Sequence, residues 1–134
     1  MNLSAFIAQI SAVGAGAVLL ASCAPADHPD QAAAPELTGR TAGPARRCVL
    51  INTGESLRII GPDKVIYGSG KTVWVNDLRT SCPGMDRMDV LVVQPLAGQY
   101  CNGDRVQILH PTTNSLGAEC LLGDFIPYER SPSE

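Results

Sequence analysis

Seven short apolar runs, rich in β-branched residues, constrain the fold more than any other feature of the chain. They occupy residues 48–51, 57–60, 65–67, 72–75, 89–93, 105–109 and 120–126. Turn sequences rich in glycine, proline, asparagine and aspartate bound each run, and no stretch repeats apolar side chains at helical spacing. The pattern predicts an all-β fold, a small antiparallel barrel or sandwich of about six or seven short strands.

Two of these runs carry further information about their place in a sheet. The run beginning at Arg105 alternates, so Val106 and Ile108 should face inward while Gln107 faces water. The run 89–93 is apolar on both faces after its first residue, which predicts a central strand.

Four cysteines fall within this β-rich region, at Cys48, Cys82, Cys101 and Cys120. An even number in a small exported domain with few aromatic residues predicts two disulfides, and three pairings are possible. We favour Cys48–Cys120, which would join the first and last strands, with Cys82–Cys101 clamping the excursion between them. A zinc site or a redox motif would need closely spaced pairs such as C-x-x-C, and the sequence has none. No metal is therefore expected.

The N-terminus has the shape of a targeting segment. Residues 3–21 are mostly apolar and end in L-A-S-C, which resembles the bacterial lipobox. We predict a lipoprotein signal peptide over residues 1–22 and a lipid-modified Cys23. An ordinary cleaved signal and an uncleaved membrane anchor remain alternatives. Residues 1–6 contain no lysine or arginine, which counts against export.

The rest of the chain divides by composition. Residues 23–45 contain four prolines, many alanines and few large apolar side chains, which predicts a disordered tether from the lipid to the β-module. The module is expected over 46–130, and residues 131–134 are expected to form a disordered tail.

The stretch G-S-G-K-T resembles the end of a nucleotide-binding loop. The full motif requires a glycine five positions before Gly70, where the chain has Val65, and a helix afterwards, where it has V-W-V. We interpret the stretch as a hairpin turn and expect no nucleotide. The net charge of -3, without runs of like charge, also gives no reason to expect nucleic acid as a partner.

No catalytic constellation emerges from the sequence, and no cofactor is expected. His110 is the single histidine of the module and is expected at a strand end, while Ser69 lacks the G-x-S-x-G context of a hydrolase nucleophile. Asp104 is expected to stabilise the turn in C-N-G-D, and a bulge is expected between Gly123 and Asp124.

A possible binding loop surrounds the glycine turn. It comprises Tyr67, Ser69, Lys71 and Trp74, which combine aromatic, hydroxyl and cationic side chains. The alternative for Trp74 is that it fills the core of a domain short of aromatic residues.

The cysteine motifs also resemble a known family. They read R-R-C-V, C-P-G-M, Q-Y-C-N-G-D-R-V and E-C-L-L-G-D-F-I, between residues 46 and 126. This pattern resembles an uncharacterised family, a domain of unknown function in small exported bacterial proteins that are often lipoproteins. Members often carry an aromatic residue where this chain has Val49. The resemblance implies an envelope location and no established activity.

The sequence thus predicts a non-enzymatic lipoprotein of a Gram-negative-type envelope, facing the periplasm. Its partners would be the lipid bilayer, through acylated Cys23, and a periplasmic protein or envelope component. One alternative is an inhibitor of an exported hydrolase that uses residues 61–71 as its loop. Another is an enzyme that uses clustered carboxylates.

Overall fold

The computed structural model describes residues 34–132. This part of the chain forms ten strands and one short 3₁₀ helix, η1. In chain order the elements are η1 (Pro35–Leu37), β1 (Arg40–Ala42), β2 (Cys48–Leu50), β3 (Arg58–Gly61), β4 (Lys64–Tyr67), β5 (Thr72–Asp77), β6 (Val90–Val93), β7 (Gln99–Cys101), β8 (Arg105–His110), β9 (Ser115–Leu121) and β10 (Phe125–Arg130).

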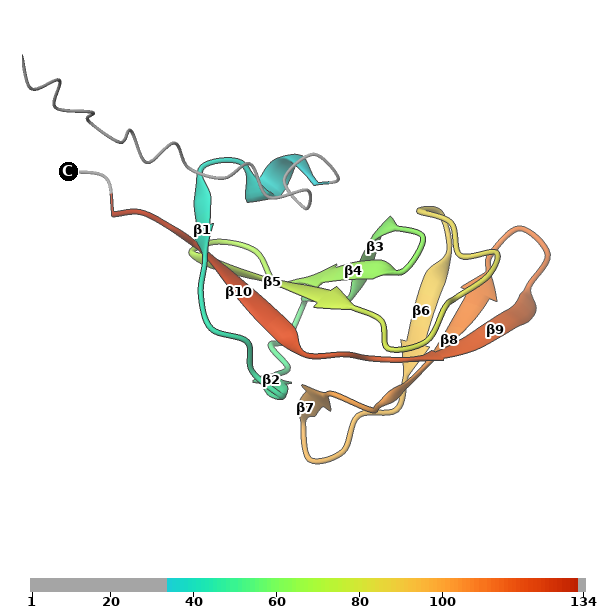
Figure 1. Ribbon diagram of the computed structural model, residues 1–134. Helices are drawn as coiled ribbons and strands as arrows, with labels where there is room; N and C mark the ends of the chain where they lie inside the picture. The colour runs from blue at the N-terminus through green and yellow to red at the C-terminus, as the bar shows by residue number, and fades with distance from the viewer. Residues whose placement is uncertain (1–33, 133–134) are drawn as a thin grey trace, which may run out of the picture.

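The strands form three antiparallel sheets, so the predicted all-β class is confirmed (Figure 1). The largest has the order β1-β10-β5-β4-β3, the second has the order β6-β8-β9, and the third pairs β2 with β7. The sheets do not close into a barrel. After β9 ends at Leu121, the chain leaves the three-stranded sheet and begins β10 in the five-stranded sheet at Phe125.

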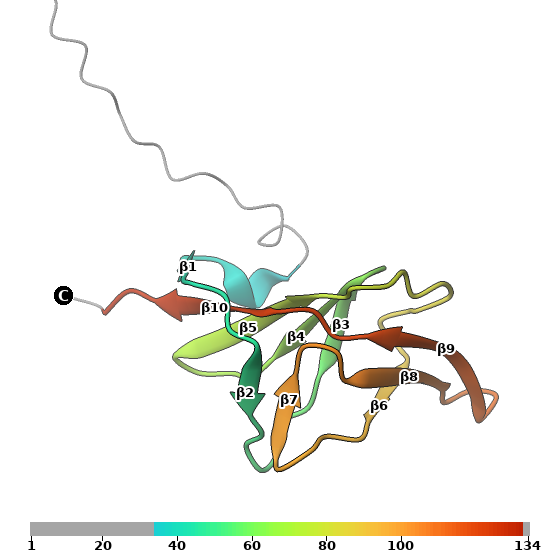
Figure 2. The same cartoon turned by 60° about the horizontal axis from the view of Figure 1, so that its bottom comes forward.

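The five-stranded sheet separates two parts of the core. On one face, Leu37 of η1 packs against Ile66 and Tyr128. On the other face, Val65 belongs to a cluster that also takes Val106 from the three-stranded sheet. Figure 2 shows η1 on one side of the large sheet and the β2–β7 pair on the other. Successive residues of the central strands therefore contribute to different clusters, as the two-residue period of a strand requires.

The alternation predicted for β8 is confirmed, since Val106 and Ile108 are both fully buried. The central position predicted for the run 89–93 is wrong. In the part of the chain that the structure describes, its strand β6 pairs with β8 alone, and β8 is the middle strand of that sheet. Val90 and Val92 face outward at the sheet edge, so the apolar character of both faces did not reflect burial on both faces.

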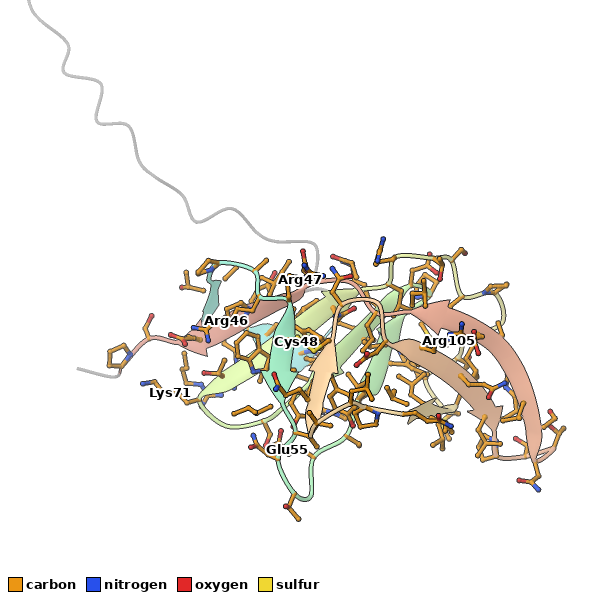
Figure 3. All side chains as sticks on the ribbon, turned by 90° about the horizontal axis from the view of Figure 1, so that it is seen from below. Arg46, Arg47, Cys48, Glu55, Lys71 and Arg105 are labelled. Carbon is orange, nitrogen blue, oxygen red and sulfur yellow. A yellow bond between two sulfur atoms is a disulfide. The ribbon has the colours of Figure 1, made fainter. Side chains whose placement is uncertain are left out.

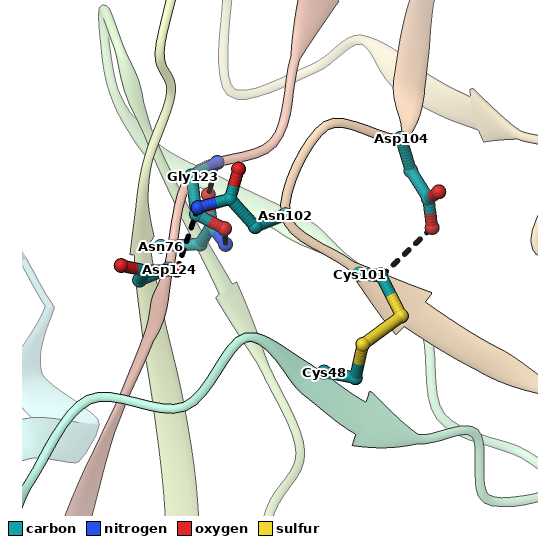
Figure 4. The surroundings of a disulfide bond; sticks show 7 residues. All are labelled: Cys48, Asn76, Cys101, Asn102, Asp104, Gly123 and Asp124. Atoms are coloured by element: carbon teal, nitrogen blue, oxygen red, sulfur yellow. Dashed lines mark hydrogen bonds between the residues drawn. A yellow bond between two sulfur atoms is a disulfide. The ribbon is translucent and has the colours of Figure 1, made fainter.

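Two disulfides are present, as predicted, but the predicted pairing is wrong. One bond joins Cys48 to Cys101 (Figure 4), and the other joins Cys82 to Cys120. Cys48 lies directly opposite Cys101 because β2 pairs with β7. The pairing of Cys48 with Cys120 assumed that β2 and β9 were neighbours, whereas β9 pairs with β8.

The folded module begins before Arg46, which corrects the predicted extent of the tether. Leu37 is fully buried, and β1 pairs with β10 from Arg40 to Ala42. Leu37 is held because it fills the cluster beneath η1. The predicted signal peptide, Cys23 and the remaining tether lie outside the described residues. Of the predicted tail, residues 131–132 have no regular structure and 133–134 are not described.

Candidate binding surfaces

The G-S-G-K-T stretch is a hairpin turn, as predicted. Strands β4 and β5 pair antiparallel on either side of it, with Tyr67 opposite Trp74. Gly68 and Gly70 adopt φ values of 86° and 74°. These left-handed conformations favour glycine, because a Cβ would strain the backbone. The glycines thus serve the turn, and no helix follows them.

The four residues of the predicted binding loop do not form one surface. Tyr67 is 1% exposed, so its place in that loop is wrong. Its hydroxyl donates to the carbonyl of Leu50 at 3.2 Å and accepts from the amide of Asn52 at 2.6 Å. Ser69 is exposed and donates to Glu55 at 2.6 Å. Tyr67 is buried because it packs edge-on against Tyr100, a contact that depends on the β2–β7 pair.

Trp74 both packs on the core and lines a surface groove. Its ring contacts the cluster around Val65, while the guanidinium of Arg46 lies 5.8 Å from the ring centroid. The groove beside it has a volume of about 420 Å³ and also includes Glu129 and Arg130. Figure 3 shows Arg46 and Lys71 toward the same end of the molecule. Lys71 is exposed at the β4–β5 turn.

A second groove, of about 440 Å³, runs between the edges of two different sheets. Residues 56–60, which include most of β3, line one wall. The first two residues of β6, Val90 and Leu91, line the other, with Arg87 and Asp89 before them and residues 34–36 beside them. Among residues 34–132, β3 pairs with β4 alone and β6 with β8 alone. Leu57, Ile59 and Leu91 connect the groove to the core. We call this the edge groove.

Exposed apolar side chains lie on β6 and in the segments on either side of it, and one of them, Val90, lines the edge groove. Val90 and Val92 on β6 are 49% and 40% exposed, and Met88 and Leu96 at either side of the strand are both 79% exposed. An exposed apolar sheet edge is a template for pairing with another chain, which soluble proteins normally block with charges or proline. This row is therefore a candidate surface for contact with another chain.

The carboxylate of Asp104 has a clear structural task. Asp104 accepts from the amide of Cys101 at 2.7 Å and stabilises the C-N-G-D turn, as predicted (Figure 4). The bulge expected at Gly123 is instead the crossing between sheets, where Gly123 exchanges two hydrogen bonds with the buried side chain of Asn76. Sequence reasoning missed Asn76, because an asparagine near a strand end is usually exposed.

His110 lies at the end of β8, as predicted, and contacts one carboxylate. Its Nδ1 is 2.7 Å from Asp89, and this hydrogen bond holds the pKa of Asp89 below its ordinary value. No nucleophilic hydroxyl bonds to His110 within residues 34–132. The same residues contain no group of three or more His, Cys, Asp or Glu placed to hold a metal ion. The pair therefore ties β6 to β8 and forms no complete catalytic triad.

The comparisons with known proteins yield no relative for this chain. No family model, no curated protein and no solved structure matches it. The resemblance to an uncharacterised exported family therefore stays a prediction.

No helix within residues 34–132 is long and apolar enough to cross a membrane. The predicted signal segment precedes these residues.

The two disulfides differ in exposure, which predicts an order of reduction. Cys48 is exposed, whereas Cys82 and Cys120 are 2% and 1% exposed. Because a thiolate must reach the sulfur that it attacks, mild reductant should open Cys48–Cys101 first. Stepwise alkylation followed by peptide mapping should label Cys48 and Cys101 before the other two. Simultaneous labelling of all four cysteines would contradict this order, because it would show that burial does not protect the Cys82–Cys120 bond from the reductant.

Proposed function

We propose that the chain is a non-enzymatic envelope lipoprotein of the uncharacterised exported type, anchored through acylated Cys23 and facing the periplasm. Its β-module binds an extended segment of an envelope protein, which adds as a strand in the edge groove. The two unpaired edges of β3 and β6, bordering one groove, carry this proposal.

The disulfides support the exported location. Structural disulfides form and persist in oxidising compartments and are rare in the cytosol of most organisms. Both bonds of this chain follow a stretch that ends in L-A-S-C, so the covalent structure and the targeting pattern agree.

The backbone of the two edges supports strand addition. In β-augmentation, main-chain hydrogen bonds provide affinity and alternate side-chain contacts provide specificity. The carbonyl of Ile60 on the β3 edge accepts a hydrogen bond from the guanidinium of Arg87 at 2.9 Å, so an added strand would take the place of Arg87 at this carbonyl. A strand lying between β3 and β6 would connect the two larger sheets.

The occupant is best provided by another protein. Residues 24–33 lie next to the groove in sequence, since Ala34 lines it. They include Pro25 and Pro29, and proline cannot donate to a ladder in the middle of a sheet. The exposed Val90 and Val92 instead favour a segment with apolar residues at alternate positions.

The hydrolase-inhibitor alternative receives no support from the stretch that it named. Residues 61–71 contain β4, a strand with a partner on each side in the five-stranded sheet. Val65, Ile66 and Tyr67 are buried there, so the strand offers no anchor, and what the stretch exposes beyond it is the small turn that carries Ser69 and Lys71.

A charge at the edge should abolish strand addition. We expect Val92→Lys to weaken binding of a peptide of about ten residues, alternating valine and threonine, by at least about 10-fold. Leu116→Lys is the matched control, because Leu116 is 62% exposed on β9, the opposite edge strand of the same sheet. Fluorescence anisotropy of a labelled peptide measures the affinity.

A second control separates strand addition from general hydrophobic contact. The same peptide with methyl groups on alternate backbone nitrogens keeps its side chains but loses donors for the ladder. It should fail to bind. Equal affinity for the two peptides, or equal effects of Val92→Lys and Leu116→Lys, would refute the proposed mode.

A further inference from the structure

We infer that the module has a membrane-facing end, made by Arg46, Lys71 and Arg130 with Trp74, which docks on anionic phospholipid headgroups. We call it the basic end. This inference rests on the proposed lipid anchor for its biological setting, and it concerns a surface other than the edge groove.

The basic end gathers charge from three separate parts of the chain. Arg46 and Arg130 line the groove beside Trp74, and Arg130 and Lys71 line the hollow next to it. All three cations are exposed. Glu129 is the acidic residue among those lining the two hollows, so positive charge exceeds negative charge there.

This excess is local. Residues 34–132 contain ten lysines and arginines and ten aspartates and glutamates, because three of the 13 acidic residues, Asp27, Asp30 and Glu134, lie outside that range. The described module is therefore neutral as a whole. A neutral module with a cationic end has an electric dipole, which would turn that end toward an anionic surface.

Arg40 fixes the start of the module against this end. Its guanidinium donates to the carbonyl of Glu36 at 2.7 Å, to that of Lys71 at 2.6 Å and to that of Gly70 at 2.6 Å. One buried side chain thus joins η1, near the first described residue, to the turn that carries Lys71. Ala34 itself lines the edge groove, so the link between the start of the described chain and the basic end runs through Arg40.

The chain before the module is too short to hold it far from a bilayer. Ala34 follows Cys23 by 11 positions. Fully extended, that length spans at most about 40 Å. A module whose first described residues are joined to the basic end through Arg40 is therefore confined near the membrane that would hold Cys23.

Trp74 gives this end a second property suited to a membrane interface. Its ring is half-buried beside Arg46 at the rim of the groove. Tryptophan is enriched at headgroup level, where its apolar body and polar N–H are both accommodated, and each nearby lysine or arginine adds attraction to anionic lipid.

The test measures binding to vesicles without the lipid anchor. The chain from residue 23, carrying Cys23→Ser and both disulfides, is sedimented with vesicles of phosphatidylglycerol and phosphatidylcholine or of phosphatidylcholine alone. We expect binding to the anionic vesicles that falls as salt rises. The double variant Lys71→Glu/Arg130→Glu should bind at least about 10-fold more weakly.

A matched variant controls for total charge. Arg79→Glu/Arg105→Glu changes the net charge equally. Arg79 and Arg105 are both exposed, and neither lines the two hollows of the basic end. Figure 3 shows Arg105 far from Arg46 and Lys71. This variant should bind as the parent does. Equal loss in both double variants, or equal binding to both kinds of vesicle, would overturn the inference. Lys71→Gln/Arg130→Gln, which only neutralises the charges, must also weaken binding. The tested chain carries Cys23→Ser and has no lipid. A lack of vesicle binding would therefore refute the basic end as a docking surface without bearing on the proposed acylation of Cys23.

Discussion

Replacing Cys82 and Cys120 together by alanine is expected to leave the chain largely unfolded at physiological temperature. The bond closes a loop with a sequence separation of 38 residues. By the chain-entropy relation, that constraint contributes about 4 kcal/mol to the free energy of unfolding. The two cysteines also form part of a buried cluster with Ile108, so their removal costs packing as well. The total free energy of unfolding of a small domain is about 5–15 kcal/mol, so this loss is a large part of it.

The second disulfide provides the control for this result. Cys48–Cys101 has a sequence separation of 53 residues, which predicts a similar entropic contribution of about 4 kcal/mol. Cys48 is exposed, however, so its replacement leaves no comparable cavity. Urea unfolding followed by circular dichroism should therefore rank the Cys82/Cys120 variant as the less stable one. A parent-like midpoint for that variant would contradict the role assigned to the buried bond.

Asn76→Leu is expected to destabilise the fold by about 3 kcal/mol, because it leaves two buried backbone groups without partners. The side chain of Asn76 donates to the carbonyl of Gly123 and accepts from its amide, both at 2.8 Å. Leucine has a similar volume and can do neither. The bonds secure the point where the chain passes from the three-stranded to the five-stranded sheet (Figure 4).

Asn102→Ala tests whether the large loss of stability expected for Asn76→Leu comes from the burial of its hydrogen bonds. Asn102 donates to Asp124 at 2.6 Å near the same crossing, but that contact is exposed. We expect a loss of less than about 1 kcal/mol, because water can replace the lost bond. Urea midpoints compare the two variants, and equal losses would show that the buried network around Gly123 has no special weight.

Local patterns in the sequence identified much of this fold. The two-residue alternation from Arg105 onward predicted which residues of β8 enter the core, and the glycines of G-S-G predicted a turn between two strands. Both are local properties: the strand period assigns side chains to faces, and a left-handed φ favours glycine. The same local reasoning placed Asp104 in its turn.

Pairing between distant segments could not be obtained this way. Cys48 could have met any of three partners, and its pairing with Cys101 depends on β2 lying beside β7. Strand β1 was missed because it has only three residues, which carry little apolar signal. It is held by its pairing with β10 and by the buried Leu37 of η1 just before it. Patterns within a single sequence do not specify which strands pair with one another.

The candidate sites show the same division. Tyr67 looked like part of a binding loop, yet packing against Tyr100 from another sheet removes it from the surface. The edge groove was not predicted, because it is formed by residues from β3 and β6, which are far apart in sequence and belong to different sheets. The exposed valines of β6 were the available signal, and the run was assigned to a central strand instead.

The central claim is an exported, lipid-anchored and disulfide-stapled module, and the intact mass of protein extracted from membranes tests it most directly. The sample is measured with and without reduction before alkylation. We predict a chain that begins at Cys23 and carries added acyl groups, with four alkylations appearing only after reduction. A chain that retains residues 1–22, carries no acyl groups and alkylates freely without reductant would contradict the claim.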